Sequence, residues 1–226
     1  MFDYFLPEKW RKTPRTVLTD SERVYETKTK DDIHLVCRVS RVGRSLPADA
    51  PPEAGEHGYN SPFEEVVFAL ELSNNGVETT YPRAIYMSRH KTEVVSEPGD
   101  TSRYQTHQGL LTPDGHPVLS YEHEYIVLWG FWNGPDEMLA EQDKDYYRPV
   151  DLYRARQEGL VTRGVCDKLM QVTSDRLLEV GVEALRLKPD HLLLSVGANG
   201  KPAMDANGLP RVLLSSFDLL RHTSQE

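Results

Sequence analysis

The sequence has few cysteines, no long apolar run and no basic surplus, and each absence excludes a class of protein. Its two cysteines, Cys37 and Cys166, are too few for a disulfide framework and lack the spacing of metal ligands. The longest apolar run, residues 125–132, is too short to span a bilayer. The N-terminus lacks the basic start and apolar core of a signal peptide. We therefore expect a soluble protein in the reducing cytoplasm, with no membrane partner.

A formal net charge of −9 also argues against nucleic acid as a partner, because nucleic-acid binding needs a basic surface. Basic residues do gather in two short stretches, residues 9–15 and residues 38–44. The first contains Lys9, Arg11, Lys12 and Arg15, and the second contains Arg38, Arg41 and Arg44. Short runs of one charge usually form solvated faces. We expect both stretches to lie in solvent.

Common catalytic motifs are also absent. The sequence contains no Gly-x-Ser-x-Gly, no Gly-x-Gly-x-x-Gly and no His-x-x-x-His motif. The run from Tyr121 to Tyr125 does contain Glu122, His123 and Glu124, but on a strand the two glutamates share one face and the histidine lies on the other. A solvated strand start is favoured there over a metal site. Ser215 and Ser216 beside Asp218 are read as the end of a strand near the core, in preference to a nucleophile.

Two strands are predicted near the start of the chain. Residues 24–29 form the first, and residues 33–42 form the second after a turn at residues 30–32. In the second strand Leu35, Cys37 and Val39 alternate with Val36, Arg38 and Ser40, which is the two-residue period of a strand. Cys37 is therefore expected to be buried and inert. The first 20 residues are either an arm packed on this sheet or a partner-binding segment.

A helix over residues 62–74 is the clearest local prediction. Ser61 can cap it, Pro62 fits its first position and Glu64 completes a capping box. The sequence Asn74-Asn75-Gly76 ends it. Residues spaced three and four apart predict the buried face, namely Phe63, Val66, Val67 and Leu70. The preceding residues 43–60 have no apolar period and are predicted to be an exposed loop.

The remaining elements alternate between strands and helices. Strands are predicted at residues 77–87, 121–131, 191–196 and 211–217, a hairpin at residues 109–119, and a loop at residues 88–106. Helices are predicted to begin at Pro135, to span residues 151–158, and to follow Thr162 as far as Val180. Two Asn-Gly pairs, at residues 199–200 and 207–208, predict tight turns. The fold class expected is α+β.

This order, together with two motifs, resembles the protein-kinase superfamily. Leu187-Lys188-Pro189 followed by Leu192-Leu193-Leu194 looks like the catalytic loop and the strand after it. Residues 212–219 look like the strand that delivers the metal-binding Asp-Phe-Gly. The stretch from Asn75 to Pro82 is similar to the link after the corresponding helix in bacterial lipopolysaccharide kinases and other minimal kinases. The resemblance covers roughly residues 22–220.

The resemblance implies an architecture and a set of binding residues. Residues 1–132 would form a kinase-like N-terminal lobe, an antiparallel sheet with an N-terminal arm and helix 62–74. Residues 133–226 would form a truncated, helical C-terminal lobe containing the loop-like segment 183–220. Arg38 would replace the phosphate-binding lysine, with Glu64, Glu65 or Glu71 as its acidic partner. The implied cofactor-binding residues, for ATP without a metal, are Arg38, Glu65, Trp129, Lys188 and Asp218.

The departures from the family pattern bear on activity. Arg186 stands at the catalytic aspartate, His191 at the metal-binding asparagine, Ser216 at the metal-binding aspartate and Asp218 at the glycine. A guanidinium cannot accept a proton from a substrate hydroxyl, and a serine brings no charge to Mg²⁺. Catalysis by the standard route is not expected.

Three functions follow from these observations. The first is a pseudokinase-like protein that acts by binding a protein partner. The second is an unorthodox phosphotransferase in which Asp190, Asp205 or Asp218 supplies the missing carboxylates. The third is an unrelated α+β interaction domain.

Overall fold

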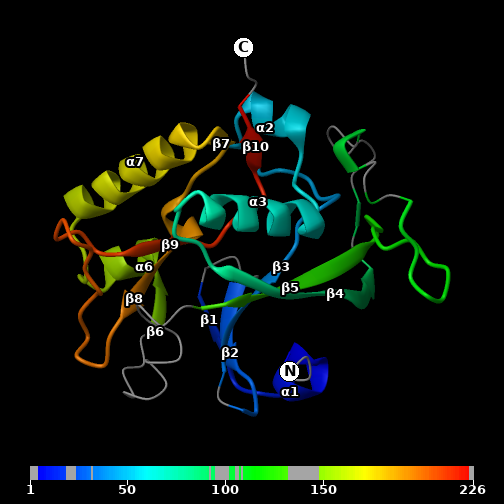
Figure 1. The fold of residues 1–226 in the computed structure, drawn as a ribbon, viewed down its shortest axis with the longest axis horizontal. Coiled ribbons are helices and arrows are strands. Elements are labelled where there is room, and N and C mark those ends of the chain that lie inside the picture. The colour runs from blue at the N-terminus through cyan, green and yellow to red at the C-terminus, as the bar shows by residue number, and fades with distance from the viewer. Residues whose placement is uncertain are drawn as a thin grey trace.

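The computed structural model describes residues 5–18, 24–31, 33–91, 93–94, 102–104, 107, 109–131 and 148–223. The helix predicted to begin at Pro135, and Trp132, lie outside these ranges. Within them the chain is α+β with antiparallel sheets, as predicted (Figure 1). No helix in the described part of the chain has both the length and the apolar character needed to cross a bilayer.

The first half of the chain forms a five-stranded antiparallel sheet in the order β1-β2-β3-β5-β4. Its strands are β1 (Arg15–Val17), β2 (Val24–Lys28), β3 (His34–Val39), β4 (Tyr81–Lys91) and β5 (His123–Gly130). In Figure 1, helix α3 (Pro62–Asn74) lies on one side of this sheet and the short helix α1 (Pro7–Trp10) on the other. The predicted sheet is confirmed, and residues 5–18 pack on it as an arm, because Trp10 is buried against Tyr25, Leu35, Cys37 and Leu128.

The second half contributes a smaller set of helices and strands. They are β6 (Arg148–Asp151), α6 (Leu152–Gln157), α7 (Arg163–Glu179), β7 (Val182–Ala184), the 3-10 turn η3 (Pro189–His191), β8 (Leu192–Val196), β9 (Val212–Leu214) and β10 (Leu220–His222). The strands form a sheet ordered β6-β8-β9 and a two-stranded β10-β7 sheet. Thr162 caps α7 as predicted, and Gly200 and Gly208 have positive φ in the two predicted Asn-Gly turns. The helical C-terminal lobe of a kinase stays a prediction.

Both faces of β3 are buried, which the two-residue period alone did not indicate. Leu35 and Cys37 pack with Trp10 on the α1 side, whereas Val36 belongs to the large core cluster that also contains Phe68 of α3. Because side chains two apart share a face, Arg38 points to the same side as Val36. A charged residue is thereby directed toward α3, and it is 4% exposed.

Helix α3 begins and ends where predicted, but it buries a different face. The capping box is present, with the Ser61 hydroxyl accepting from the Glu64 amide and the Glu64 carboxylate accepting from the Ser61 amide. The buried residues are Pro62, Glu65, Phe68, Ala69 and Leu72, whereas Val67 and Leu70 are exposed. The predicted face was wrong for Val67 and Leu70, whereas Phe63 and Val66 are half-buried and pack against core clusters. Nearly every side of this helix carries an apolar residue, so their spacing does not single out one face. The buried face also contains Glu65, so a search for apolar residues spaced three and four apart does not find this face.

Several segments differ from their predictions for local reasons. Residues 43–60 are not a plain exposed loop, because Pro52 opens the short helix α2 (Pro52–His57) and Tyr59 packs against Leu185 and Leu219. Residues 77–80 precede β4 and pair with β9, with Thr79 bridging Leu214. Strand β4 also extends past Met87 to Lys91, and a 3-10 turn, η2 (Ser102–Tyr104), follows it. The hairpin turn is as predicted, since Gly115 has a φ of 81°.

Candidate functional site

The candidate site is built where the end of β9 meets β3 and α3. After β9 the chain runs through Ser216, Phe217 and Asp218, and this segment is fastened by one buried side chain. The Asn60 amide group donates to the carbonyls of Phe217 (2.7 Å) and Leu220 (2.9 Å), and the Asn60 backbone N–H donates to the Asp218 carbonyl (2.7 Å). The link between α2 and α3 therefore fixes Asp218 beside β3.

Arg38 and Asp218 meet in this position through a short chain of polar contacts. The Arg38 guanidinium donates to the Ser216 hydroxyl (Nη1 to Oγ 2.9 Å), and that hydroxyl donates to the Asp218 carboxylate (2.8 Å). The other carboxylate oxygen lies 3.9 Å from Arg38 Nη1 and 3.9 Å from Arg41 Nε. We refer to the group as the buried charge cluster, whose members are Arg38, Arg41, Glu65, His191, Ser216 and Asp218.

Burial sets the protonation of the uncharged members of this cluster. Burial away from solvent is the largest cause that raises the pKa of Glu65 to about 8, and repulsion from Asp218 is the second; Arg38 opposes the shift. Loss of solvent likewise lowers the pKa of His191 to about 4, so the imidazole is neutral at pH 7. At that pH Glu65 is therefore mostly a protonated acid.

The charged members hold one another in the ionised state. Burial alone would raise the pKa of Asp218, but the charges of Arg38 and Arg41 and the hydrogen bond from Ser216 help to outweigh it and the pKa is lowered. Burial lowers the pKa of Arg38, while Asp218 and Glu65 act in the opposite direction. For Arg41, Asp218 and Tyr59 outweigh burial and raise the pKa. A carboxylate shared by two guanidinium groups and a hydroxyl is thus the centre of the cluster.

The structure brings together three of the five residues predicted to bind a cofactor, namely Arg38, Glu65 and Asp218. Trp129 is fully buried, with its ring centroid 4.9 Å from that of Phe217, so it belongs to the core. Lys188 lies apart, beside a pocket of about 250 Å³ that it lines with Asp151, Tyr153, Pro189 and Asp190. As predicted, an acidic residue of α3, Glu65, acts electrostatically on Arg38.

Arg186 and the other two alternative carboxylates, Asp190 and Asp205, are not members of the cluster. Arg186 is tied to Asp49 of the loop after β3, with Nη2 2.5 Å from Oδ2. Asp205 accepts the backbone N–H groups of Asn207 and Leu209 within its own turn. Asp190 lies 3.8 Å from the His191 ring and acts electrostatically on Arg38 and Arg41. Of the three alternative carboxylates, Asp218 lies inside the cluster and Asp190 lies next to it.

Two residues of the site were missed from the sequence. Arg41 was assigned to a solvated face, and this was wrong for the whole stretch 38–44: Arg38 is buried, and the side chains of Arg41 and Arg44 are 22% and 20% exposed. No local pattern indicated Arg41, because it lies beyond the end of β3 and its partner Asp218 is far away along the chain. Asn60 offered no signal either, because its partners lie more than 150 residues away.

The acidic strand start forms ion pairs, as its charges indicate. Glu122 accepts from Lys91 (2.9 Å), Glu124 is paired with Arg44, and the His123 ring contacts the Ser88 carbonyl at 2.9 Å. No group of three metal-binding side chains occurs among the described residues. The interpretation as a solvated strand start agrees with these contacts.

Comparison with known proteins adds little. No protein-family model matches the sequence, and no curated protein matches it. Among solved structures, the chain is similar to WaaP in complex with acyl carrier protein, at 13% sequence identity and a TM-score of 0.40. The match covers 94% of this chain, which spans 64% of that chain. A likeness at this level does not establish a shared fold.

Proposed function

We propose that this protein is kinase-like but lacks phosphotransfer activity, and that it acts by binding another protein. The observation that carries the proposal is the internal pairing of Arg38 with Ser216 and Asp218. In kinases a lysine on the third strand pairs with a glutamate of the following helix, and an aspartate after a later strand holds Mg²⁺. Arg38, Glu65 and the segment 216–218 occupy matching places in the order of elements, which supports the kinase-like half of the proposal.

The chemistry of these residues supports the non-catalytic half. A nucleotide and its metal need exposed cationic and anionic groups, but Arg38, Glu65 and Asp218 are 4%, 0% and 3% exposed. Asp218 is neutralised by Arg38 and Arg41, so a cation would have to displace both. Arg186, at the position of the catalytic base, cannot accept a proton and is held by Asp49.

Exposed apolar residues on α3 support the protein-binding half. Val67 and Leu70 are 50% and 37% exposed, and Val67 borders a groove of about 490 Å³ together with Phe63 and Phe68. Apolar side chains at successive turns of a helix, next to a groove, fit the apolar face of a helix from a partner protein. The phosphotransferase and the unrelated interaction domain remain the alternatives.

Thermal melts with ATP, in the presence and absence of Mg²⁺, test the absence of catalysis. A ligand at 100 times its Kd stabilises a protein by about 2.7 kcal/mol, which is readily measured. We expect no stabilisation that needs Mg²⁺, and no transfer of phosphate from labelled ATP. Mg²⁺-dependent stabilisation, together with transfer that Asp218→Asn abolishes, would establish the phosphotransferase instead. That variant loses about 3–5 kcal/mol because two guanidinium groups lose their carboxylate, so it is assayed at low temperature.

A photo-crosslinking amino acid at position 67 tests the protein-binding half. Position 172 on α7 is the matched control, because Val172 is 49% exposed, like Val67. We expect position 67, and not position 172, to crosslink to one partner in cells, and Leu70→Asp to abolish the association measured with that partner in purified form. Equal crosslinking at both positions, or association that Leu70→Asp leaves intact, contradicts binding through α3.

A further inference from the structure

The segment between β3 and α3 crosses the surface of the second half of the chain. We refer to residues 45–58 as the strap; they include α2, which Figure 1 shows beside β7 and β10. Leu46, Ala50 and Ala54 of the strap pack with Leu185 and Leu219, which are both buried. The strap therefore covers an apolar surface that forms where β7 ends and β10 begins.

One ion pair holds the middle of the strap on this surface. The Arg186 guanidinium donates to the Asp49 carboxylate, with Nη2 2.5 Å from Oδ2. This hydrogen bond lowers the pKa of the Asp49 carboxyl, and the charges of Arg186 and Lys188 lower it as well. The Arg186 side chain is 10% exposed, whereas that of Asp49 is 74% exposed. The basic partner thus belongs to the covered surface, and the acidic partner belongs to the strap.

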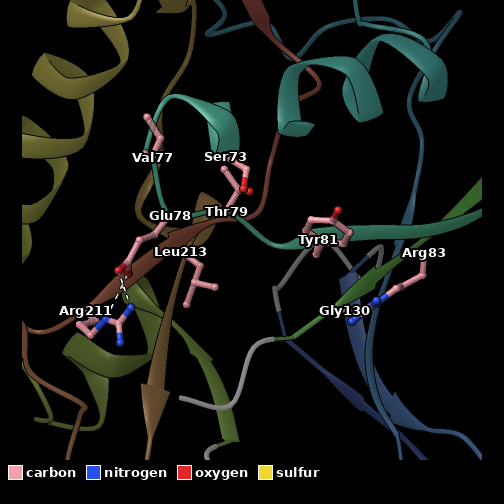
Figure 2. Close-up of a pocket in the computed structure, with 10 residues that line it drawn as sticks. Ser73, Val77, Glu78, Thr79, Tyr81, Arg83, Gly130, Arg211 and Leu213 are labelled. Carbon is pink, nitrogen blue, oxygen red and sulfur yellow. Dashed lines mark hydrogen bonds and ion pairs between the residues drawn. The ribbon is translucent and has the colours of Figure 1, made fainter. Parts of the chain in front are cut away.

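A second ion pair between distant segments provides a comparison. Glu78, in the link between α3 and β4, pairs with Arg211 at one end of a cavity of about 600 Å³ (Figure 2). The backbone joins the same two segments, because the Thr80 N–H donates to the Leu214 carbonyl and the Leu214 N–H donates to the Glu78 carbonyl, both at 2.9 Å. This ion pair therefore reinforces a contact that the backbone already makes.

The strap has no comparable support from its backbone. Among the described residues, the contact of Asp49 with Arg186 is the one hydrogen bond between residues 45–56 and any part of the chain outside the strap. The other hydrogen bonds of these residues close turns within the strap, as the bond from the Gly58 N–H to the Ala54 carbonyl does. Segments with few apolar contacts open locally at a lower cost in free energy than the core does. The strap is such a segment.

The chemistry of the strap indicates what else can bind to the surface beneath it. Residues 45–58 contain three acidic residues, Asp49, Glu53 and Glu56, and no lysine or arginine. Their apolar side chains are small, apart from that of Leu46. A guanidinium recognises carboxylates, and apolar burial stabilises in proportion to the area removed from water. A protein segment that offers a carboxylate together with larger apolar side chains would therefore replace the strap.

We propose that Leu185, Arg186 and Leu219 form a protein-binding surface, which the strap occupies until an acidic segment of a partner protein displaces it. The partner's carboxylate pairs with Arg186, and its apolar side chains cover the two leucines. The inference goes beyond the function proposed above, because this surface uses neither the buried charge cluster nor the exposed face of α3.

A thiol introduced beneath the strap measures whether the strap opens. Ala54 in the strap and Ala69 on α3 are both fully buried, so the same substitution can be made at each. The native Cys37 and Cys166 are buried and give little background. We expect Ala54→Cys to react with N-ethylmaleimide at least tenfold faster than Ala69→Cys, because local opening exposes only position 54. Equal rates, in variants whose melting temperatures show that they are folded, overturn the proposal.

The ion pair is tested in the Ala54→Cys background. Exposed ion pairs contribute little, so Asp49→Asn is expected to raise the rate at position 54 by about two- to fivefold. Glu78→Gln removes the acidic partner of the pair in Figure 2 and is the matched control, which should leave that rate unchanged. An equal effect of the two substitutions overturns the role of Asp49.

A free peptide with the sequence of the strap tests the chemistry of the partner on the wild-type protein. At millimolar concentration it competes with the tethered strap, whose effective concentration is of that order. We expect amide chemical shifts to move at Leu185, Arg186 and Leu219, and the peptide to accelerate the reaction at position 54 because it holds the strap open. A peptide with lysine in place of Asp49 should do neither. Equal effects of the two peptides, or no shifts at these residues in either the wild type or Asp49→Asn, overturn the proposal.

Discussion

The guanidinium of Arg38 is held almost entirely out of water, because the alternation of side chains along β3 directs it into the core. Moving an ion from water into a protein interior costs several kcal/mol, so a buried charge needs a partner and further hydrogen bonds. Arg38 has both, because Ser216 accepts one of its N–H groups and Asp218 balances its charge. A lysine would not serve equally well, since a buried ammonium loses its proton readily, whereas a guanidinium keeps its charge.

Glu65 gives the cluster a pH dependence whose sign can be worked out. Its pKa is 4.5 in an ordinary setting and about 8 in the fold, so between these values the unfolded chain has lost a proton that the folded chain keeps. Stability therefore falls as the pH rises through this window. His191, with its pKa lowered from 6.5 to about 4, has the opposite effect between those two values. The two offset each other from pH 4.5 to 6.5.

We therefore predict that stability falls from pH 6.5 to pH 8, by at most about 1.4 kcal/mol per pH unit. Urea unfolding at a series of pH values measures it. Glu65→Gln should remove the slope, because an amide cannot ionise, whereas Glu56→Gln on the exposed surface of α2 should keep it. Parallel curves for the wild type and Glu65→Gln would show that Glu65 is already ionised in the fold.

At the scale of one element, α3 shows which of its features depend on neighbouring residues and which depend on residues far away in the sequence. Its start follows from Ser61, Pro62 and Glu64 and its end from Asn75 and Gly76, and the contacts of these residues lie within one turn, so the sequence predicts both ends correctly. Its buried face depends on the residues that pack against it. Glu65 is buried on that face, where Asp218 and Arg38 both act on it electrostatically. The same distinction holds for the site. The kinase resemblance implied an acidic partner for Arg38 on α3 without choosing among Glu64, Glu65 and Glu71, whereas Arg41 and Asn60 depend on contacts with residues 216–220 that no local pattern encodes.

Two identical substitutions on α3 test which face carries the stability. Leu72 is 1% exposed and Leu70 is 37% exposed, although both lie in the last turns of the same helix. Leu72→Ala should cost about 2–5 kcal/mol, because it leaves a cavity in the core. Leu70→Ala should cost much less, since its side chain already contacts water. Chemical denaturation gives both values, and equal losses would restore the face first predicted from the sequence.

At the scale of the whole molecule, the main hydrophobic core joins the two halves of the chain. One cluster contains Val36, Phe68 and Trp129 from the first half together with Leu193 and Phe217 from the second. Hydrogen bonds also connect the same two halves. They join residues 77–80 to β9, and the Asn60 side chain to the Phe217 carbonyl. A division into lobes at residue 132 therefore describes the order of the elements along the chain, whereas the packing joins the elements on either side of that residue.

This shared core predicts that the molecule unfolds in one step. The chain provides a separate probe for each half, because all three tryptophans precede residue 133, whereas α7, with 17 residues, lies in the second half and contributes strongly to far-UV circular dichroism. Tryptophan fluorescence and circular dichroism should give the same midpoint in urea, since burial of Trp129 depends on Phe217 and Leu193. Leu193→Ala, made in the second half, should then lower the fluorescence midpoint as much as the circular dichroism midpoint. If fluorescence keeps its wild-type midpoint in that variant, the first half folds by itself and the two lobes are energetically separate.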